Sequence, residues 1–123
     1  MCRLVNAPGT TNFYDMRYRP LYERLLETVL SMPGDTTPAL RRAALERAQE
    51  NRDTGAELSA GLARYVDTVA RHAYKVTDAD VAALQRAGQS DDSLFEITVA
   101  AAVGAAPHRL DRGMAALRGQ EPD

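Results

Sequence analysis

The sequence predicts an all-α protein, a bundle of about five or six helices with one long, alanine-rich helix at its centre. Apolar residues recur at helical spacing in several segments, and no segment alternates apolar and polar residues for long enough to form a sheet. The stretch ITVAAAVGAA, residues 97–106, is apolar on nearly every side, as expected of a helix buried among others. The length of 123 residues fits one domain with a single core.

The ends of the chain differ in composition from its middle. Residues 1–13 are predicted to form a flexible N-terminal arm, because Pro8, Gly9 and the polar residues after them favour turns. A single helical domain is expected over residues 14–119. Residues 120–123 are expected to fray.

The first two helices are predicted from their proline signals and their apolar spacing. One begins near Arg19 and Pro20 and ends before Pro33, and its expected apolar face is formed by Leu21, Leu25, Val29 and Leu30. The next spans about residues 38–51 and is mostly charged. It is therefore expected to lie on the surface, with Leu40, Ala43, Ala44 and Leu45 on its inner side and Arg41 on its outer side.

Three more helices follow. The third is predicted from about residue 55 to residue 75, with an apolar stripe formed by Leu58, Leu62, Tyr65, Val66, Val69 and Ala73. Thr77 begins a short fourth helix that ends at Gly88, and Ser90 caps a long fifth helix. Pro107 either kinks this fifth helix or starts a new one.

The order of these segments between Tyr65 and Leu117 resembles the alkylhydroperoxidase D-like (AhpD-like) and carboxymuconolactone decarboxylase family. The resemblance rests on the turn sequence AYKVTDAD, on the sequence AGQSDD before the long helix, and on the alanine-rich helix itself. It implies an AhpD-like helical bundle that assembles as a homo-oligomer, such as a trimer or a hexamer.

The redox residues of that family are missing from this chain. In its peroxidase branch a Cys-x-x-Cys pair is followed four residues later by His, and these positions fall on Ala73, Val76 and Asp80. The family's catalytic Glu falls near Gly61. Because a thiol peroxidase needs an attacking and a resolving thiol, the resemblance implies a degenerate active site without that chemistry. The single cysteine, Cys2, lies in the predicted arm.

The same segment keeps polar and aromatic side chains that could act on a small organic acid. His72 and Asp80 are the candidate catalytic residues, as general acid or base. The candidate substrate-binding residues are Tyr65, Arg71, Tyr74 and Lys75. Structural alternatives stay open for these residues: a boundary histidine bonded to a neighbouring helix, a helix-capping aspartate, a solvated lysine at a helix end, and core or interface tyrosines.

Three functional hypotheses follow. The chain binds or converts a small organic acid or lactone in a non-redox way, as the carboxymuconolactone decarboxylases of this fold do without a Cys pair. Alternatively, it is a non-catalytic homo-oligomeric scaffold or accessory protein. The third hypothesis is a peroxidase-type antioxidant activity that uses Cys2. The sequence leaves open whether the protein is an enzyme.

Composition argues against several other classes. The 15 basic and 17 acidic residues are interspersed, which gives no basic surface for nucleic acid. The two histidines lack companion ligands at metal-binding spacing and no glycine-rich phosphate loop occurs, so neither a metal nor a cofactor is predicted. One cysteine, no apolar leader and no long apolar run predict a soluble cytoplasmic protein without a membrane segment.

Overall fold

The computed structural model describes residues 18–50 and 58–119, and this part of the chain is helical with short connections and contains no strand. The all-α fold class predicted from the sequence is confirmed. The predicted N-terminal arm, with Cys2, and the predicted frayed C-terminus lie outside the described residues. The elements are α1 (Arg19–Ser31), α2 (Pro38–Glu50), α3 (Ala60–His72), the 3-10 turn η3 (Ala73–Lys75), α4 (Asp78–Arg86) and α5 (Asp91–Leu117).

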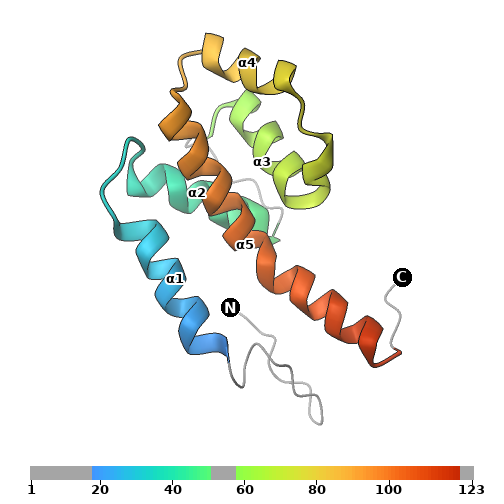
Figure 1. Cartoon of the computed structure of the whole chain (residues 1–123). Helices are drawn as coiled ribbons and strands as arrows, with labels where there is room; N and C mark the ends of the chain where they lie inside the picture. Colours follow the sequence, from blue (N-terminus) through green and yellow to red (C-terminus); the bar gives the residue numbers. More distant parts are fainter. Residues whose placement is uncertain (1–17, 51–57, 120–123) are drawn as a thin grey trace.

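The long helix α5 is the centre of the bundle, as its alanine-rich sequence predicts. It contacts α1, α2 and α3, whereas α4 packs on α3 (Figure 1). Its inward face is formed by small and aliphatic residues, namely Leu94, Ile97, Ala100, Ala101, Gly104 and Ala105. Of the two outcomes expected at Pro107, the helix continues through it to Leu117. No described helix is both long and apolar enough to cross a lipid bilayer.

The predicted inner side of α2 is confirmed, with Leu40 also packed against the core. Ala43, Ala44 and Leu45 are buried in the core, and α2 packs along α5 more extensively than any other helix does. The contact is very close at Gly104, where a Cβ atom would overlap the main-chain oxygen of Leu45. The sequence does not predict how extensive this contact is, because alanines alone give a weak apolar signal.

Helix α1 sits on the outside of the bundle, and its predicted apolar face is split in two. Leu26, Val29 and Leu30 pack against the core, whereas Leu21 and Leu25 are exposed. The Tyr22 hydroxyl donates a hydrogen bond of 2.6 Å to the main-chain oxygen of Val103 on α5. This bond fixes which side of α1 faces inward.

Helix α3 is shorter than the sequence predicts. Ser59 is its N-cap and accepts a hydrogen bond from the amide of Leu62, so Leu58 and Ser59 precede the helix. At the other end the backbone leaves helical geometry at His72, with φ −144° and ψ 58°. The predicted caps of the last two helices are confirmed, since Thr77 and Ser90 each accept a capping hydrogen bond.

Arg41 is the buried charge that joins α1 to α2. Only 3% of this residue is exposed. Its guanidinium donates hydrogen bonds to the main-chain oxygens of Val29 at 2.8 Å, Met32 at 2.5 Å and Thr36 at 2.7 Å. Two of these oxygens belong to the end of α1, where carbonyl groups lack partners within the helix. The prediction that Arg41 points outward is therefore wrong, because its partners are backbone groups.

Glu96 of α5 holds the loop between α1 and α2 from the other side. Its carboxylate accepts hydrogen bonds of 2.8 Å from the amides of both Asp35 and Thr36, and one of 2.5 Å from the Thr36 hydroxyl. A Cβ atom at Gly34 would overlap this carboxylate. The Thr36 hydroxyl, the two amides and the charge of Arg41, 3.6 Å away, together hold the pKa of Glu96 below its usual value.

Protonation of Glu96 is expected to destabilise the fold. The pKa of Glu96 is lower in the folded chain than the ordinary value of 4.5. The stability that Glu96 contributes is therefore complete above pH 4.5 and is lost as the pH falls through the lowered pKa. We expect Glu96→Gln to lower the free energy of unfolding by about 2 kcal/mol at pH 7. Between pH 5 and pH 3, the free energy of unfolding measured by urea denaturation should fall less for this variant than for the wild type.

The matched control for this experiment is Glu23→Gln. Glu23 forms an exposed pair with Arg19 on α1, so its replacement should change stability by less than about 0.5 kcal/mol. Parallel pH profiles for the wild type and Glu96→Gln would contradict the assigned role of Glu96. Asp67, whose pKa is lowered chiefly by its hydrogen bond with Arg47, accounts for part of the remaining dependence.

Candidate functional site

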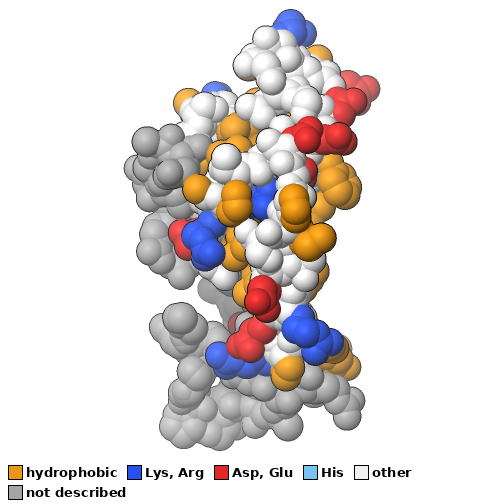
Figure 2. All heavy atoms as spheres, turned by 90° about the vertical axis from the view of Figure 1, so that its left-hand side faces the viewer, with side chains coloured by type: hydrophobic (Ala, Val, Ile, Leu, Met, Phe, Trp, Pro, Cys, Tyr) orange, Lys and Arg blue, Asp and Glu red, His pale blue; other side chains and the backbone are white. Residues whose placement is uncertain are grey.

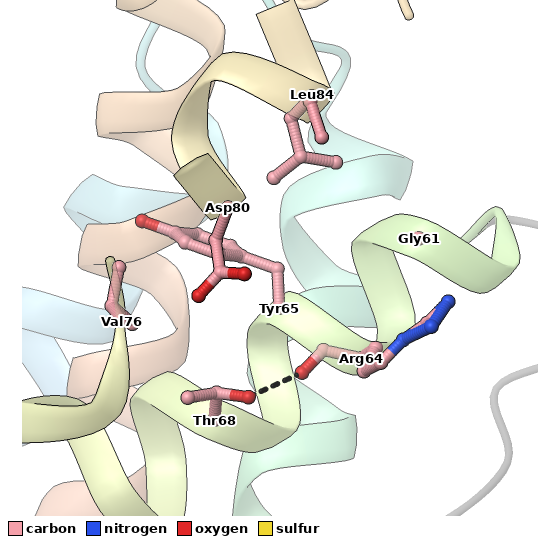
Figure 3. A pocket seen from close by; sticks show the side chains of 8 residues that line it. Gly61, Arg64, Tyr65, Thr68, Val76, Asp80 and Leu84 are labelled. Carbon is pink, nitrogen blue, oxygen red and sulfur yellow. Dashed lines mark hydrogen bonds between the residues drawn. The ribbon is translucent and has the colours of Figure 1, made fainter. Parts of the chain in front are cut away.

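A pocket of about 250 Å³ lies between α3 and α4, and we call it the α3–α4 pocket (Figure 3). Its walls combine polar groups with small and aliphatic ones. It is lined by Gly61, Arg64, Tyr65, Thr68, Val76, Asp80, Ala83 and Leu84. It therefore includes two of the six site residues that the sequence predicts, Tyr65 and Asp80.

The turn between α3 and α4 creates this pocket. After η3, the chain is extended at Val76, and Thr77 starts α4 so that this helix folds back over α3. Gly61 on α3 faces Leu84 on α4, and a Cβ atom at Gly61 would lie 3.6 Å from the Leu84 side chain. The missing side chain at Gly61 thus leaves room between the two helices.

Arg64 supplies the positive charge of the pocket. Its side chain is exposed, and its guanidinium donates no hydrogen bond to any residue of the described ranges. In Figure 3 the Asp80 carboxylate projects from α4 toward α3, whereas the Arg64 guanidinium lies on the side away from it. The two charges do not neutralise each other by an ion pair, so Arg64 is available to a ligand.

Tyr65 presents its ring to the pocket and its hydroxyl to α5. The hydroxyl lies 2.7 Å from the Thr98 hydroxyl, which itself donates to the main-chain oxygen of Leu94 at 2.6 Å. Because the single hydroxyl hydrogen of Thr98 is already used, Tyr65 is the donor in their bond. A substrate in the pocket would therefore meet the ring of Tyr65.

Asp80 serves as a helix cap. Its carboxylate accepts a hydrogen bond of 3.0 Å from the amide of Thr77, and the Thr77 hydroxyl accepts one of 3.1 Å from the amide of Asp80. This reciprocal pair is a capping box. The structural alternative weighed for Asp80 is thus realised, and its role as general base stays a prediction.

The other four predicted site residues lie outside the α3–α4 pocket. His72, Tyr74 and Lys75 form an exposed surface cluster, in which the rings of His72 and Tyr74 are 6.1 Å apart and Lys75 Nζ is 6.0 Å from the Tyr74 ring centre. Arg71 lines a different pocket. Tyr74 and Lys75 lie in η3, after α3 has ended at His72.

Arg64 and Thr68 are pocket residues that the sequence analysis did not select as site residues. Their spacing along the sequence indicates that they share one face of the helix. Residues 61, 64 and 68 lie on one face of a helix, next to Tyr65. A glycine, a cation and a hydroxyl on the face that meets the next helix would have indicated the pocket.

The described ranges contain no group of three or more His, Cys, Asp or Glu side chains placed to hold a metal ion. The described lining of the pocket offers one carboxylate, of Asp80, and one guanidinium, of Arg64, and a guanidinium can pair with the carboxylate of an organic acid.

Comparison with known proteins identifies no relative: no family model, no curated protein and no solved structure matches the chain. The resemblance to the AhpD-like family therefore stays a prediction.

The capping role of Asp80 can be separated from a general effect of acidic charge. Asp80→Ala should lower the free energy of unfolding by about 1 kcal/mol, because it removes a capping-box bond. Asp78→Ala, which removes an exposed acid from the same first turn, should cost only about 0.3 kcal/mol. Urea denaturation followed by circular dichroism measures both, and equal losses would argue against the capping role.

Proposed function

We propose that this chain binds a small organic acid or lactone in the α3–α4 pocket, as a non-redox relative of the AhpD-like and carboxymuconolactone decarboxylase proteins. The observation that carries the proposal is Arg64, which lines the α3–α4 pocket and whose guanidinium has no hydrogen-bonded partner among the described residues. A guanidinium fork matches a carboxylate and forms two parallel hydrogen bonds with it.

The rest of the lining fits the hydrocarbon part of such a ligand. Val76, Ala83 and Leu84 are apolar, and the Tyr65 ring adds an aromatic surface. Ligand pockets commonly combine such walls with a few polar groups that fix orientation. A ligand would place its carboxylate or lactone carbonyl toward Arg64 and its carbon skeleton against these side chains.

Asp80 limits the charge of the ligand. A second carboxylate near Asp80 would meet a like charge, whereas a hydroxyl group could donate a hydrogen bond to it. We therefore favour a monocarboxylate or a lactone over a dicarboxylate. If the protein is an enzyme, proton transfer would rest on Asp80, the one carboxylate that lines the pocket in the described part of the chain.

The resemblance to the family supports the same pocket. Gly61, Val76 and Asp80, which fall on or near the family's catalytic Glu, second Cys and His, all line it. Ala73, at the position of the first Cys, lies in η3 outside the lining. A pocket at this position, with no thiol among its described lining residues, is what a non-redox relative needs.

A homo-oligomeric scaffold is the second candidate function, and the exposed apolar surface of α1 and α5 favours it. We call this the α1–α5 surface; its large members are Leu21, Leu25, Met32 and Phe95. Phe95 is 68% exposed and Met32 is 56% exposed. Figure 2, which views the side on which α1 lies, shows hydrophobic side chains across the middle of that face. Such a patch is typical of a protein interface.

Thermal shift against small monocarboxylates, dicarboxylates, lactones and peroxides tests the binding proposal. A monocarboxylate or lactone at 100 times its Kd should stabilise the wild type by about 2.7 kcal/mol, which raises Tm by roughly 10 °C. Arg64→Met should lose most of this shift. The control is Arg86→Met, which removes an exposed arginine of α4 that does not line the pocket.

The outcomes distinguish the two candidate functions. No saturable shift with any compound, or an equal loss in both arginine variants, would overturn the binding proposal. Light scattering on the same preparations measures molecular mass. A defined oligomer without ligand binding would support the scaffold, and a monomer at every concentration would exclude the homo-oligomer. Stabilisation by peroxides alone would point back to the hypothesis based on Cys2.

A further inference from the structure

A second pocket, of about 230 Å³, lies where α2, α3 and α5 meet, and the proposed function does not use it. We call it the junction pocket. Basic side chains and small apolar groups make up its lining, which consists of Ala48, Gln49, Ala70, Arg71, Ala105, His108 and Arg109. None of these residues lines the α3–α4 pocket. The sequence analysis selected Arg71 as an anion-binding residue, and this is where the structure places it.

The charges that line the junction pocket are positive. Two guanidinium groups and one imidazole line it, with no acidic side chain among its described lining residues. Gln49 and Ala70 lie near the ends of α2 and α3, where each helix carries roughly half a negative charge. The two guanidinium charges outweigh these helix ends by about one unit.

Arg109 has a structural role that uses one of its nitrogens. Its Nη2 donates to the main-chain oxygen of Ala70 and, at 3.4 Å, to that of Val69, which caps the end of α3. The remaining N–H groups of Arg109 are not needed for those bonds. Arg109 is therefore anchored in place and still able to contact a ligand.

Arg71 and His108 have no such role. Neither side chain makes a hydrogen bond with a residue of the described ranges. The acid one turn before Arg71 is Asp67, and both of its oxygens are taken by Arg47, at 2.7 and 2.8 Å. The pKa of Asp67 accordingly reflects Arg47 first and Arg71 least. Asp67 therefore leaves the charge of Arg71 largely unneutralised.

The lining selects a ligand by charge. The apolar members among its described lining residues are three alanines, which offer little surface for a large hydrophobic group. The side chains of Arg71, His108 and Arg109 can donate several hydrogen bonds to one ligand, which suits an oxyanion with more than two oxygens. The planar guanidinium group of arginine forms paired hydrogen bonds with phosphate. We propose that the junction pocket binds a phosphate group, either as inorganic phosphate or as the phosphate monoester of a small molecule.

Backbone amide chemical shifts of the full chain, titrated with inorganic phosphate in low-salt buffer, test this proposal. Saturable changes should centre on Ala70 and Ala105. Arg71→Met should weaken binding at least tenfold, and Arg112→Met, which removes an exposed arginine of α5 outside the pocket, should leave it unchanged. Glycerol 3-phosphate and acetate complete the panel, with the first binding like phosphate and the second much more weakly. High salt should weaken all binding.

The proposal is overturned if phosphate gives no saturable change in the millimolar range, if acetate binds equally well, or if both arginine variants lose binding alike. His108→Gln provides a second variant of the pocket if Arg71→Met does not fold, and it should also weaken phosphate binding. Arg64→Met should bind phosphate normally. This last comparison separates the junction pocket from the α3–α4 pocket, so that either proposal can fail alone.

Discussion

The close approach of α2 and α5 at Gly104 is the constraint on which the rest of the structure depends. A Cβ atom there would overlap the main-chain oxygen of Leu45 and lie 3.2 Å from the Cβ of Ala48. Small residues on both helices allow this distance. Helix α3 then packs on the pair, and Arg41 of α2 and Glu96 of α5 hold the loop that places α1.

Helix α3 forms one wall of the candidate site and is packed on this pair, whereas α4, which forms the other wall, packs on α3. Tyr65 links α3 to α5 through Thr98, and the capping box at Thr77 sets where α4 begins. Neither interaction needs a particular side chain at Val76 or on the exposed face of α3. The framework can therefore keep the α3–α4 pocket while its lining changes.

Local signals in the sequence predict much of the fold, because caps and breaks act over a few residues. Thr77, Ser90 and Gly88 mark the ends of α4 and the start of α5 correctly. The burial of Arg41 could not be predicted, since its partners are main-chain oxygens that no residue type reveals. Likewise, the sequence predicts that the third helix continues to about residue 75, whereas α3 ends at His72 and η3 follows it.

Replacing glycine by alanine at two positions of α5 tests the central constraint most directly. Gly104→Ala should lower the free energy of unfolding by roughly 1–3 kcal/mol, since α2 must shift to admit the methyl group. A Cβ atom at Gly113 meets open space, so Gly113→Ala should raise stability by about 0.5–1 kcal/mol. Urea denaturation of both variants gives the comparison. A Gly104→Ala variant as stable as the wild type would contradict the account.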